Sequence, residues 1–481
     1  MTNARSSTLS RRRRYRRLIS VTGALILTVT TFAAMVGAGA VVTDRGFHQA
    51  VPTSQGHGFW DAHIEAGSPA RHVAVRHQRP LVVAFVAGES GTVASDLLAP
   101  YDIFASSSEF RTYVVAAHAG PVLLEGGPAL VPTYTFAEVN ADSTLSPDLV
   151  VVPALSKPTG SAEAALRNWV TTQHDGGAKV LGVCAGSLVL ADTGMLDGLR
   201  ATSHWSRISA LQRSRPAVHW VTGRRWVEDG SVTTTAAVSS GVPAALHLVA
   251  ELAGPPEAQR VANLHPELRW SPHRTTVIPQ DHFAARDWPV GLNFVEPWFR
   301  PTVGIALNEG VDELDATAAF EVYTQSAAAR TVALATGDTV RTRHGLVLLT
   351  TSTRDDPSLS RLVVPGAADI EPPLRDWADS RRLDVEPLKA EAGRGHGTRS
   401  GGGFTAALQN LTEHTGATTA SSTAKMIGYP ATDVDLQNGH TTVRTVLLAL
   451  ASLTLAVLVG LTPALISRRR RRLATGRATT S

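Results

Sequence analysis

The sequence predicts an α/β fold: a parallel sheet with helices on both faces, followed by a second, truncated copy and accompanied by two transmembrane helices. Three observations lead to this prediction. Short apolar runs alternate with helix-like stretches from residue 80 onward, which is typical of a parallel sheet whose strands are joined by helices. Part of this pattern recurs, more faintly, after residue 300. Long uncharged runs flanked by arginines lie near both ends of the chain.

The two uncharged runs are long enough to cross a membrane. Residues 18–42 follow a cluster of seven arginines, and residues 446–466 precede a cluster of six. Helices of this length span a hydrocarbon layer of about 30 Å, and arginine clusters stay on the cytoplasmic side. We therefore expect a protein of the cell membrane with cytoplasmic tails at 1–17 and 467–481 and its main body outside the cytoplasm. For the first run a cleaved signal peptide is the alternative, because Ala38-Gly39-Ala40 resembles a cleavage site.

The charge distribution excludes a nucleic-acid partner. The net charge is +4, but the 13 arginines of the two ends leave about −9 for residues 44–445, and an acidic body does not bind DNA or RNA. The single cysteine, Cys184, excludes an intramolecular disulfide and a site built from several cysteines. Because His204, His219 and His247 lack the spacing of metal ligands, we predict no metal and no cofactor.

The first domain is expected at 79–268, after a linker at 43–78. Its predicted elements are strands at 81–87, 111–117, 149–152 and 179–183, helices at 93–105, 162–172 and 244–253, and short β-prone pieces in 218–238. A connection at 269–300, a second module at 301–430 and a linker at 431–445 complete the body.

The second module repeats landmarks of the first. Residues 314–323 echo 95–104, 363–365 echo 151–153, and 403–408 echo 241–246. Asp96 and Asp315 are 219 positions apart, whereas Gly241 and Gly403 are 162 apart, so the second copy is 57 residues shorter between these landmarks. The missing stretch is the one that holds Cys184. We therefore expect the second copy to lack the strand before the cysteine and to pack on the first as one cooperative unit.

Any chemistry is expected at Cys184. The apolar strand at 179–183 runs through Cys184-Ala185-Gly186 into a helix, which is the nucleophile-elbow pattern with cysteine at the turn. A helix N-terminus favours the thiolate, so we expect a lowered pKa for the thiol. The alternative is a buried structural cysteine at a strand end.

Residues 182–191, continued by 194–205, resemble the ThiJ/PfpI superfamily, and in particular the isonitrile hydratases and the amidotransferase-like sensor half of AraC-type regulators. Asp96 matches the acidic residue on the first βα connection of the family, and Ser239-Ser240-Gly241 before the last helix also fits. The resemblance covers 79–268 well and 301–430 weakly. It implies the flavodoxin-like, class I glutamine-amidotransferase-like fold, a parallel-sheet sandwich.

The resemblance also implies roles for individual residues. Cys184 would be the nucleophile, and a protonated Asp96 would share a hydrogen bond with its sulfur. His204 would be a general base or polariser, or merely a cap beside Trp205, and the backbone N–H of Ala185 would stabilise an oxyanion. Ala185 stands where the intracellular peptidases have histidine and the hydratases usually threonine, which disfavours a protease. The family commonly has paired glycines whose backbone N–H groups supply a second oxyanion donor. This chain has Pro153-Ala154-Leu155 at that place, so it lacks the glycine pattern.

Together these observations predict a membrane-anchored extracytoplasmic protein whose first module is a cysteine-dependent hydrolase, hydratase or lyase acting on a small electrophile. The alternative is a non-catalytic ligand-binding or redox-sensing module in which Cys184 is oxidised rather than turned over. The expected partners are a small-molecule substrate or ligand, membrane lipid through the two helices, and a second copy in a homodimer.

Overall fold

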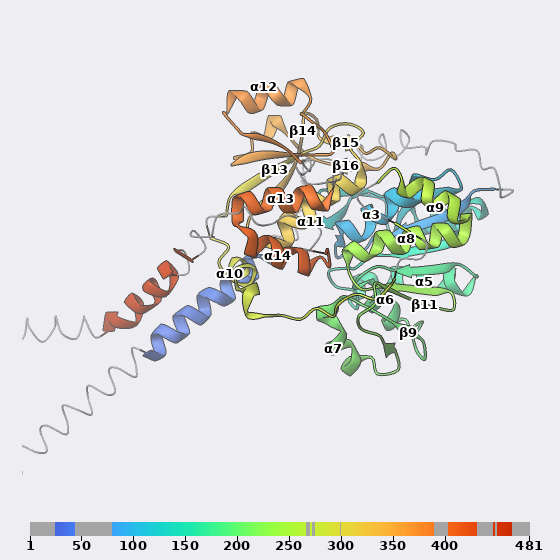
Figure 1. Ribbon diagram of the computed structural model, residues 1–481, viewed down its shortest axis with the longest axis horizontal. Helices are drawn as coiled ribbons and strands as arrows, with labels where there is room; N and C mark the ends of the chain where they lie inside the picture. The colour runs from blue at the N-terminus through green and yellow to red at the C-terminus, as the bar shows by residue number, and fades with distance from the viewer. Residues whose placement is uncertain are drawn as a thin grey trace, which may run out of the picture. The chain divides into compact units, whose positions relative to one another are not determined.

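The computed structural model describes residues 25–43, 79–265, 270–271, 275–298, 300–388, 403–430, 446–447 and 450–463 (Figure 1). Contacts divide the chain into two compact units. The first, here called the terminal unit, comprises residues 1–44, 291–299 and 442–481. The second, here called the α/β unit, comprises residues 45–290 and 300–441.

The terminal unit contains apolar helices from both ends of the chain. Helix Leu25–Thr43 has 19 residues and a mean hydropathy of 2.1, and within the described residues it alone is long and apolar enough to cross a membrane. Helix Leu450–Pro463 is apolar but shorter. Residues 18–24, 448–449 and 464–466 of the expected spans lie outside the described part of the chain. The two transmembrane helices therefore stay a prediction.

A seven-stranded sheet forms the first half of the α/β unit. Its strand order is β11-β12-β8-β7-β1-β3-β6, and all neighbours are parallel except β11 and β12. The strands are β1 (Leu81–Val86), β3 (Phe110–Ala116), β6 (Tyr134–Thr135), β7 (Leu149–Val152), β8 (Lys179–Gly182), β11 (Trp226–Asp229) and β12 (Val232–Thr235). The strands predicted at 81–87, 111–117, 149–152 and 179–183 are confirmed to within one residue at each end. The predicted parallel α/β architecture is therefore correct.

Helices cover both faces of this sheet because alternate residues of its central strands point to opposite sides. Val83 and Phe85 of β1 belong to one buried cluster, whereas Val82 and Ala84 belong to another. The first cluster includes side chains of α3 (Ala94–Ala105), α8 (Val238–Ala253) and α9 (Pro255–Ala262). The second includes side chains of α4 (Phe136–Ala141), α5 (Ala164–Asp175) and α6 (Gly186–Asp192).

Helix α8 begins six residues before the predicted start at 244. The prediction left Pro243 outside the helix, and a proline inside a helix removes a backbone donor. The helix instead continues through Pro243, and Val242 before it is buried in the core. The remaining elements of this half are α7 (Trp205–Ser214), β9 (Arg200–Ala201), β10 (His219–Trp220), η1 (Ser143–Leu145), η2 (Ser161–Glu163) and η4 (Ala285–Asp287). Helix α10 (Trp288–Val295) follows them in the chain.

A second parallel sheet, of order β17-β14-β13-β18-β19, forms the other half of the α/β unit. Its strands are β13 (Thr302–Ala306), β14 (Arg330–Ala335), β17 (Thr351–Ser352), β18 (Arg361–Pro365) and β19 (Val385–Leu388). Its helices are α11 (Glu313–Ser326), α12 (Pro372–Ser380), α13 (Phe404–Thr415) and α14 (Ala417–Met426), with η5 (Thr353–Asp355). The expected loss of the strand before the elbow is wrong, because β19 lies beside β18 as β8 lies beside β7. Residues 389–402, which follow β19, lie outside the described residues.

A third sheet, unpredicted, joins the two halves. Its order is β15-β16-β5-β4-β2, with β2 (Thr92–Val93), β4 (Val122–Glu125), β5 (Ala129–Val131), β15 (Thr339–Arg341) and β16 (Val347–Leu349). Leu130 of β5 pairs with Leu348 of β16, and both side chains are fully buried. One apolar cluster contains these leucines together with residues of α3 and α11. The two halves therefore share a hydrophobic core.

Candidate active site around Cys184

Cys184 lies at a strained turn between β8 and α6, at the predicted elbow. Its φ of 54° places a non-glycine residue in the left-handed region, which costs energy and is retained mainly at functional sites. The Cys184 N–H donates to Thr235 Oγ1 at 2.9 Å, and its carbonyl accepts from Ser187 Oγ at 3.1 Å. Gly186 permits the close approach of α6, because a Cβ there would lie 2.1 Å from the carbonyl oxygen of Val152.

The thiol of Cys184 is buried, with 7% of the residue exposed. Burial raises the pKa of the thiol well above its usual value, and the charge of Asp96 acts in the same direction. The backbone N–H of Ala185, which donates to the sulfur, opposes this shift. The direction of the pKa shift is opposite to the one expected from the helix N-terminus, because loss of solvation outweighs that contribution. The resting thiol is therefore protonated at neutral pH.

Asp96 is fully buried in the first turn of α3. Its Oδ2 accepts the backbone N–H of Ala154 at 3.1 Å, whereas its Oδ1 has no hydrogen-bond partner among the described residues. Burial, followed by the nearby charge of Glu321, raises the pKa of Asp96 well above its ordinary value. The carboxyl is thus held in its neutral form. Ala154, which stands where the family has paired glycines, uses its backbone donor on Asp96.

Glu321 is a further acid near the site that sequence reasoning did not single out. It lies on α11 of the second half and is only 2% exposed. Its Oε2 accepts a hydrogen bond from Ser95 Oγ at 2.8 Å, next to Asp96 in the chain. Burial raises the pKa of Glu321 to about 7. The similarity between 314–323 and 95–104 indicated that Glu321 lies in a helix. It did not indicate that this helix packs against the first half near Cys184.

His204 is the N-cap residue of α7. Its Nδ1 lies 2.7 Å from Ser206 Oγ, and its Nε2 lies 2.8 Å from the carbonyl oxygen of Met426. Since a carbonyl only accepts, Nε2 is assigned the proton, and burial lowers the pKa of His204. Among the contacts of the described residues none joins His204 to Cys184. The structure therefore places Asp96 near Cys184 and Ala185, but the expected hydrogen bond between Asp96 and the sulfur is not present among the described residues. The imidazole of His204 is engaged elsewhere.

Three groups of side chains have the composition and proximity to bind a metal ion. They are Asp102–His265–Asp312, Asp102–Glu313–His344 and Glu228–His247–Glu251, each with ligand atoms within 4.8 Å of one another. Within the described part of the chain, none of these groups includes Cys184.

Comparison with known proteins places the sequence around this site in a family. The model of the DJ-1/PfpI family matches residues 82–251. The isonitrile hydratase of Pseudomonas putida is 34% identical over 173 residues, which are 34% of this chain and 70% of that protein. The HTH-type transcriptional regulator CdhR of Pseudomonas aeruginosa is 35% identical over 157 residues, which are 32% of this chain. The match spans only 44% of the length of that regulator.

A solved structure of a ThiJ/PfpI family protein from Pseudomonas syringae is also similar. It is 26% identical, with a TM-score of 0.36, over 47% of this chain and 85% of that one. With the isonitrile hydratase matched over more than two thirds of its length, the chain belongs to the DJ-1/PfpI family.

Proposed function

We propose that the first half of the α/β unit is a cysteine-dependent site at which the Cys184 thiol adds to a small, neutral electrophile. The observation that supports this most is the strained backbone of Cys184 beside a buried carboxyl with one unpartnered oxygen. Both features cost stability, and a fold retains such costs mainly where function requires them. A merely structural cysteine would need neither.

The surroundings of the thiol limit the class of substrate. Only 7% of Cys184 is exposed, so the reacting group must be small. Asp96 and Glu321 are both buried carboxyls whose pKa values are raised, so an anionic substrate would be repelled or would force both to stay protonated. A neutral molecule with an electrophilic carbon, such as an isonitrile or an aldehyde, fits these conditions.

The neutral carboxyl of Asp96 explains how a protonated thiol can react. The sulfur forms a bond to the electrophilic carbon while Asp96 takes the thiol proton and gives its own proton to the substrate. The carboxyl ends the step neutral, so no buried charge is created on Asp96. The N–H of Ala185 stabilises the sulfur as it becomes nucleophilic. With an isonitrile, subsequent addition of water and release of the thiol would give the N-substituted formamide.

The test uses the full chain in detergent with an alkyl isonitrile and, separately, methylglyoxal. We expect consumption of one of them by proton NMR and a Cys184 adduct by mass spectrometry, both abolished in Cys184→Ala. Asp96→Asn, which keeps the shape but removes the exchangeable acid, should slow turnover while Cys184 still binds iodoacetamide. If the wild-type chain gives neither turnover nor an adduct, the catalytic proposal is overturned.

A ligand- or redox-sensing role is the second candidate, favoured by one contact. The carbonyls of Lys425 and Met426, at the end of α14, accept bonds from Trp205 and His204. The same segment reaches Ser239, whose Oγ donates to the carbonyl of Gly428 at 2.6 Å. A ligand at Cys184 could therefore shift the segment that leads toward the C-terminal apolar helix. Saturable binding without turnover, accompanied by altered hydrogen exchange at 425–428, supports this role over catalysis.

We further propose that the protein is anchored in the cell membrane with both ends in the cytoplasm and the α/β unit outside. The proposal rests on helix Leu25–Thr43 and on the arginine clusters beside both apolar runs. A reporter active only in the cytoplasm should be active after Ser481 and inactive when inserted at 266–269. The opposite result would overturn this topology.

We also propose that residues 301–430 are a degenerate copy of the first domain. The order β17-β14-β13-β18-β19 repeats β6-β3-β1-β7-β8, and α11 follows β13 as α3 follows β1. The described residues after β19 contain no counterparts of α6, α7 and β9 to β12. On this proposal the second copy serves the first by supplying Glu321. If so, the fragment 301–430 expressed alone should lack a cooperative thermal transition, and a sharp one would contradict its dependence on the first copy.

A further inference from the structure

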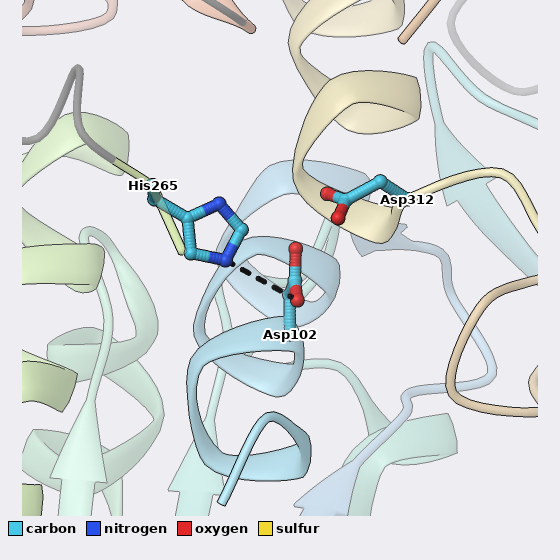
Figure 2. Close-up of side chains that lie close together, drawn as sticks. All are labelled: Asp102, His265 and Asp312. Carbon is cyan, nitrogen blue, oxygen red and sulfur yellow. Dashed lines mark ion pairs between the residues drawn. The ribbon is translucent and has the colours of Figure 1, made fainter. Parts of the chain in front are cut away.

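Five ionisable side chains from distant parts of the chain meet where the two halves of the α/β unit are in contact. We call them the acid–histidine cluster. They are Asp102 near the end of α3, His265 after α9, Asp312 and Glu313 at the start of α11, and His344 between β15 and β16. Figure 2 shows the His265 ring directed at Asp102, with Asp312 beside them from the start of α11. The cluster therefore forms only when α3 of the first half and α11 of the second half are packed together.

The cluster is buried. The side chains of Asp102 and Glu313 are fully inaccessible, and that of His265 is 6% exposed. The side chains of His344 and Asp312 are each 15% exposed. Two imidazoles and three carboxylates are therefore largely withdrawn from solvent. Such groups are rarely buried together unless they pair or bind a metal.

The distances suit a small metal ion. Asp102 Oδ1 lies 3.7 Å from His265 Nε2 and 3.5 Å from His344 Nδ1. Ligands bound tetrahedrally at about 2.0–2.1 Å lie about 3.3–3.4 Å from each other, so His265 needs to move only slightly to share an ion with Asp102. His265 forms a group of close ligand atoms with Asp102 and Asp312, whereas His344 does so with Asp102 and Glu313. His344 Nδ1 is engaged with Glu313 Oε2 in a hydrogen bond of 2.8 Å.

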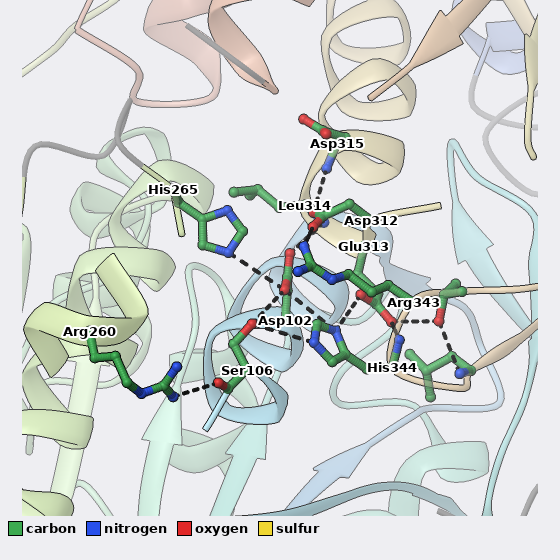
Figure 3. Close-up of polar contacts among 12 residues, drawn as sticks. Asp102, Ser106, Arg260, His265, Asp312, Glu313, Leu314, Asp315, Arg343 and His344 are labelled. Atoms are coloured by element: carbon green, nitrogen blue, oxygen red, sulfur yellow. Dashed lines mark hydrogen bonds and ion pairs between the residues drawn. The ribbon is translucent and has the colours of Figure 1, made fainter. Parts of the chain in front are cut away.

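The balance of charge also favours a cation. The three carboxylates of the cluster face one fixed positive charge, Arg343, whose Nη1 contacts Asp312 at 3.1 Å. Arg260 lies nearby (Figure 3), but it pairs with Glu257 and donates to the carbonyl of Ser106. With neutral imidazoles and all three acids ionised the cluster would have a formal charge of about −2. Burial disfavours this charge and raises the pKa of Asp102, and a bound divalent cation would take the place of the proton that Asp102 keeps.

Outer contacts hold the ligands in place, as they do at metal sites generally. The hydroxyl of Ser106 lies 3.3 Å from Asp102 Oδ1 and 3.4 Å from His344 Nε2, the ring nitrogen that faces away from the cluster. The backbone N–H of Leu314 donates to Asp102 Oδ2 at 3.2 Å. Glu313 accepts bonds from the hydroxyl of Thr342 and from the N–H of His344. Figure 3 shows these contacts converging on Asp102 and Glu313.

We propose that the acid–histidine cluster binds one divalent transition-metal ion of the Zn²⁺ class, with Asp102, His265 and Asp312 as ligands. Imidazole with carboxylate is a donor set that such ions favour. Because the ligands come from both halves, the ion would link them across their shared core. This site is separate from Cys184 and does not depend on the function proposed there.

The test uses the full chain in detergent, stripped with a chelator and titrated with Zn²⁺ by calorimetry. We expect binding of one ion per chain and a raised melting temperature. Asp102→Asn and His265→Gln should each weaken binding at least tenfold, because loss of even an outer-shell partner of a ligand costs about 10–100-fold in affinity. The matched control is His247→Gln, which alters the accessible Glu228–His247–Glu251 group and should leave the affinity unchanged.

A second measurement separates lost binding from lost folding. Co²⁺ bound to the wild-type chain should give the intense visible absorption bands of tetrahedral coordination, and these bands should be lost in His265→Gln while its far-UV circular dichroism is unchanged. Should Asp102→Asn fail to fold, Asp312→Asn replaces it in the same comparison. Absence of stoichiometric binding by the wild-type chain, or loss of binding in His247→Gln but not in His265→Gln, would overturn the proposal.

Discussion

Replacing Glu321 by glutamine tests the link between the second half of the α/β unit and the thiol. Glutamine preserves the shape of the side chain and an acceptor for Ser95 Oγ, but it cannot titrate. Burial raises the pKa of Glu321 from 4.5 to about 7. Between these values the folded chain binds a proton that the unfolded chain has released, so stability is full below about pH 4.5 and falls as the pH rises toward 7. At 1.36 kcal/mol per pKa unit the loss is about 3 kcal/mol.

The assay is urea unfolding of the full chain at about pH 5 and about pH 7.5, which bracket most of this loss. Glu321→Gln should reduce the difference between the two free energies of unfolding by about 2 kcal/mol, because part of the loss lies outside this pH interval. The control is Glu309→Gln, which alters an exposed glutamate of the same half. The variant should also alkylate faster with iodoacetamide at neutral pH, because Glu321 raises the pKa of Cys184. An unchanged pH dependence together with unchanged alkylation would refute this account of Glu321.

Two further predictions concern packing. Gly186→Ala should destabilise the protein by about 3 kcal/mol in urea unfolding, because the new Cβ would lie 2.1 Å from the carbonyl oxygen of Val152. The control is Gly337→Ala, whose new Cβ makes only an ordinary contact at 3.7 Å. This control should change the free energy of unfolding by less than about 0.5 kcal/mol. Leu130→Ala should lower the free energy of unfolding by about 2–5 kcal/mol, since Leu130 is buried against Leu348. The variant should lower the temperature of a single thermal transition of the α/β unit. Two separated transitions in the wild-type chain would contradict a shared core.

The central strands could be predicted because their signal is local. The apolar runs that contain β1 and β7 lie between Pro80 and Gly88 and between Asp148 and Pro153, and burial on both faces of a parallel sheet produces such continuous apolar runs. The hairpin of β4 and β5 could not, because its strands have four and three residues around two glycines. Pairing with β16 stabilises β5, and nothing in the sequence around residue 130 indicates a partner 218 positions away.

The residues of the Cys184 site also differ in whether the sequence could predict them. Cys184, Ala185 and the glycine after them form a contiguous pattern, and Asp96 follows from the family resemblance. Glu321 lies 226 positions from the serine to which it bonds, so it depends on how the two halves pack. The pKa of the thiol was predicted in the wrong direction for a related reason. A helix N-terminus is visible in the sequence, whereas the depth of burial around the sulfur is a property of the assembled core.

The contact between α14 and the rim of the Cys184 site has a consequence for the order in which the protein is made. His204 and the carbonyl of Met426 that it contacts are 222 residues apart. A chain emerging from the ribosome N-terminus first can complete its first sheet well before residues 425–428 exist. Until then the indole of Trp205 and the imidazole of His204 lack these acceptors, and water must satisfy them. The polar groups of these two side chains are therefore satisfied within the protein only late in synthesis, and closure of loops this long is slow.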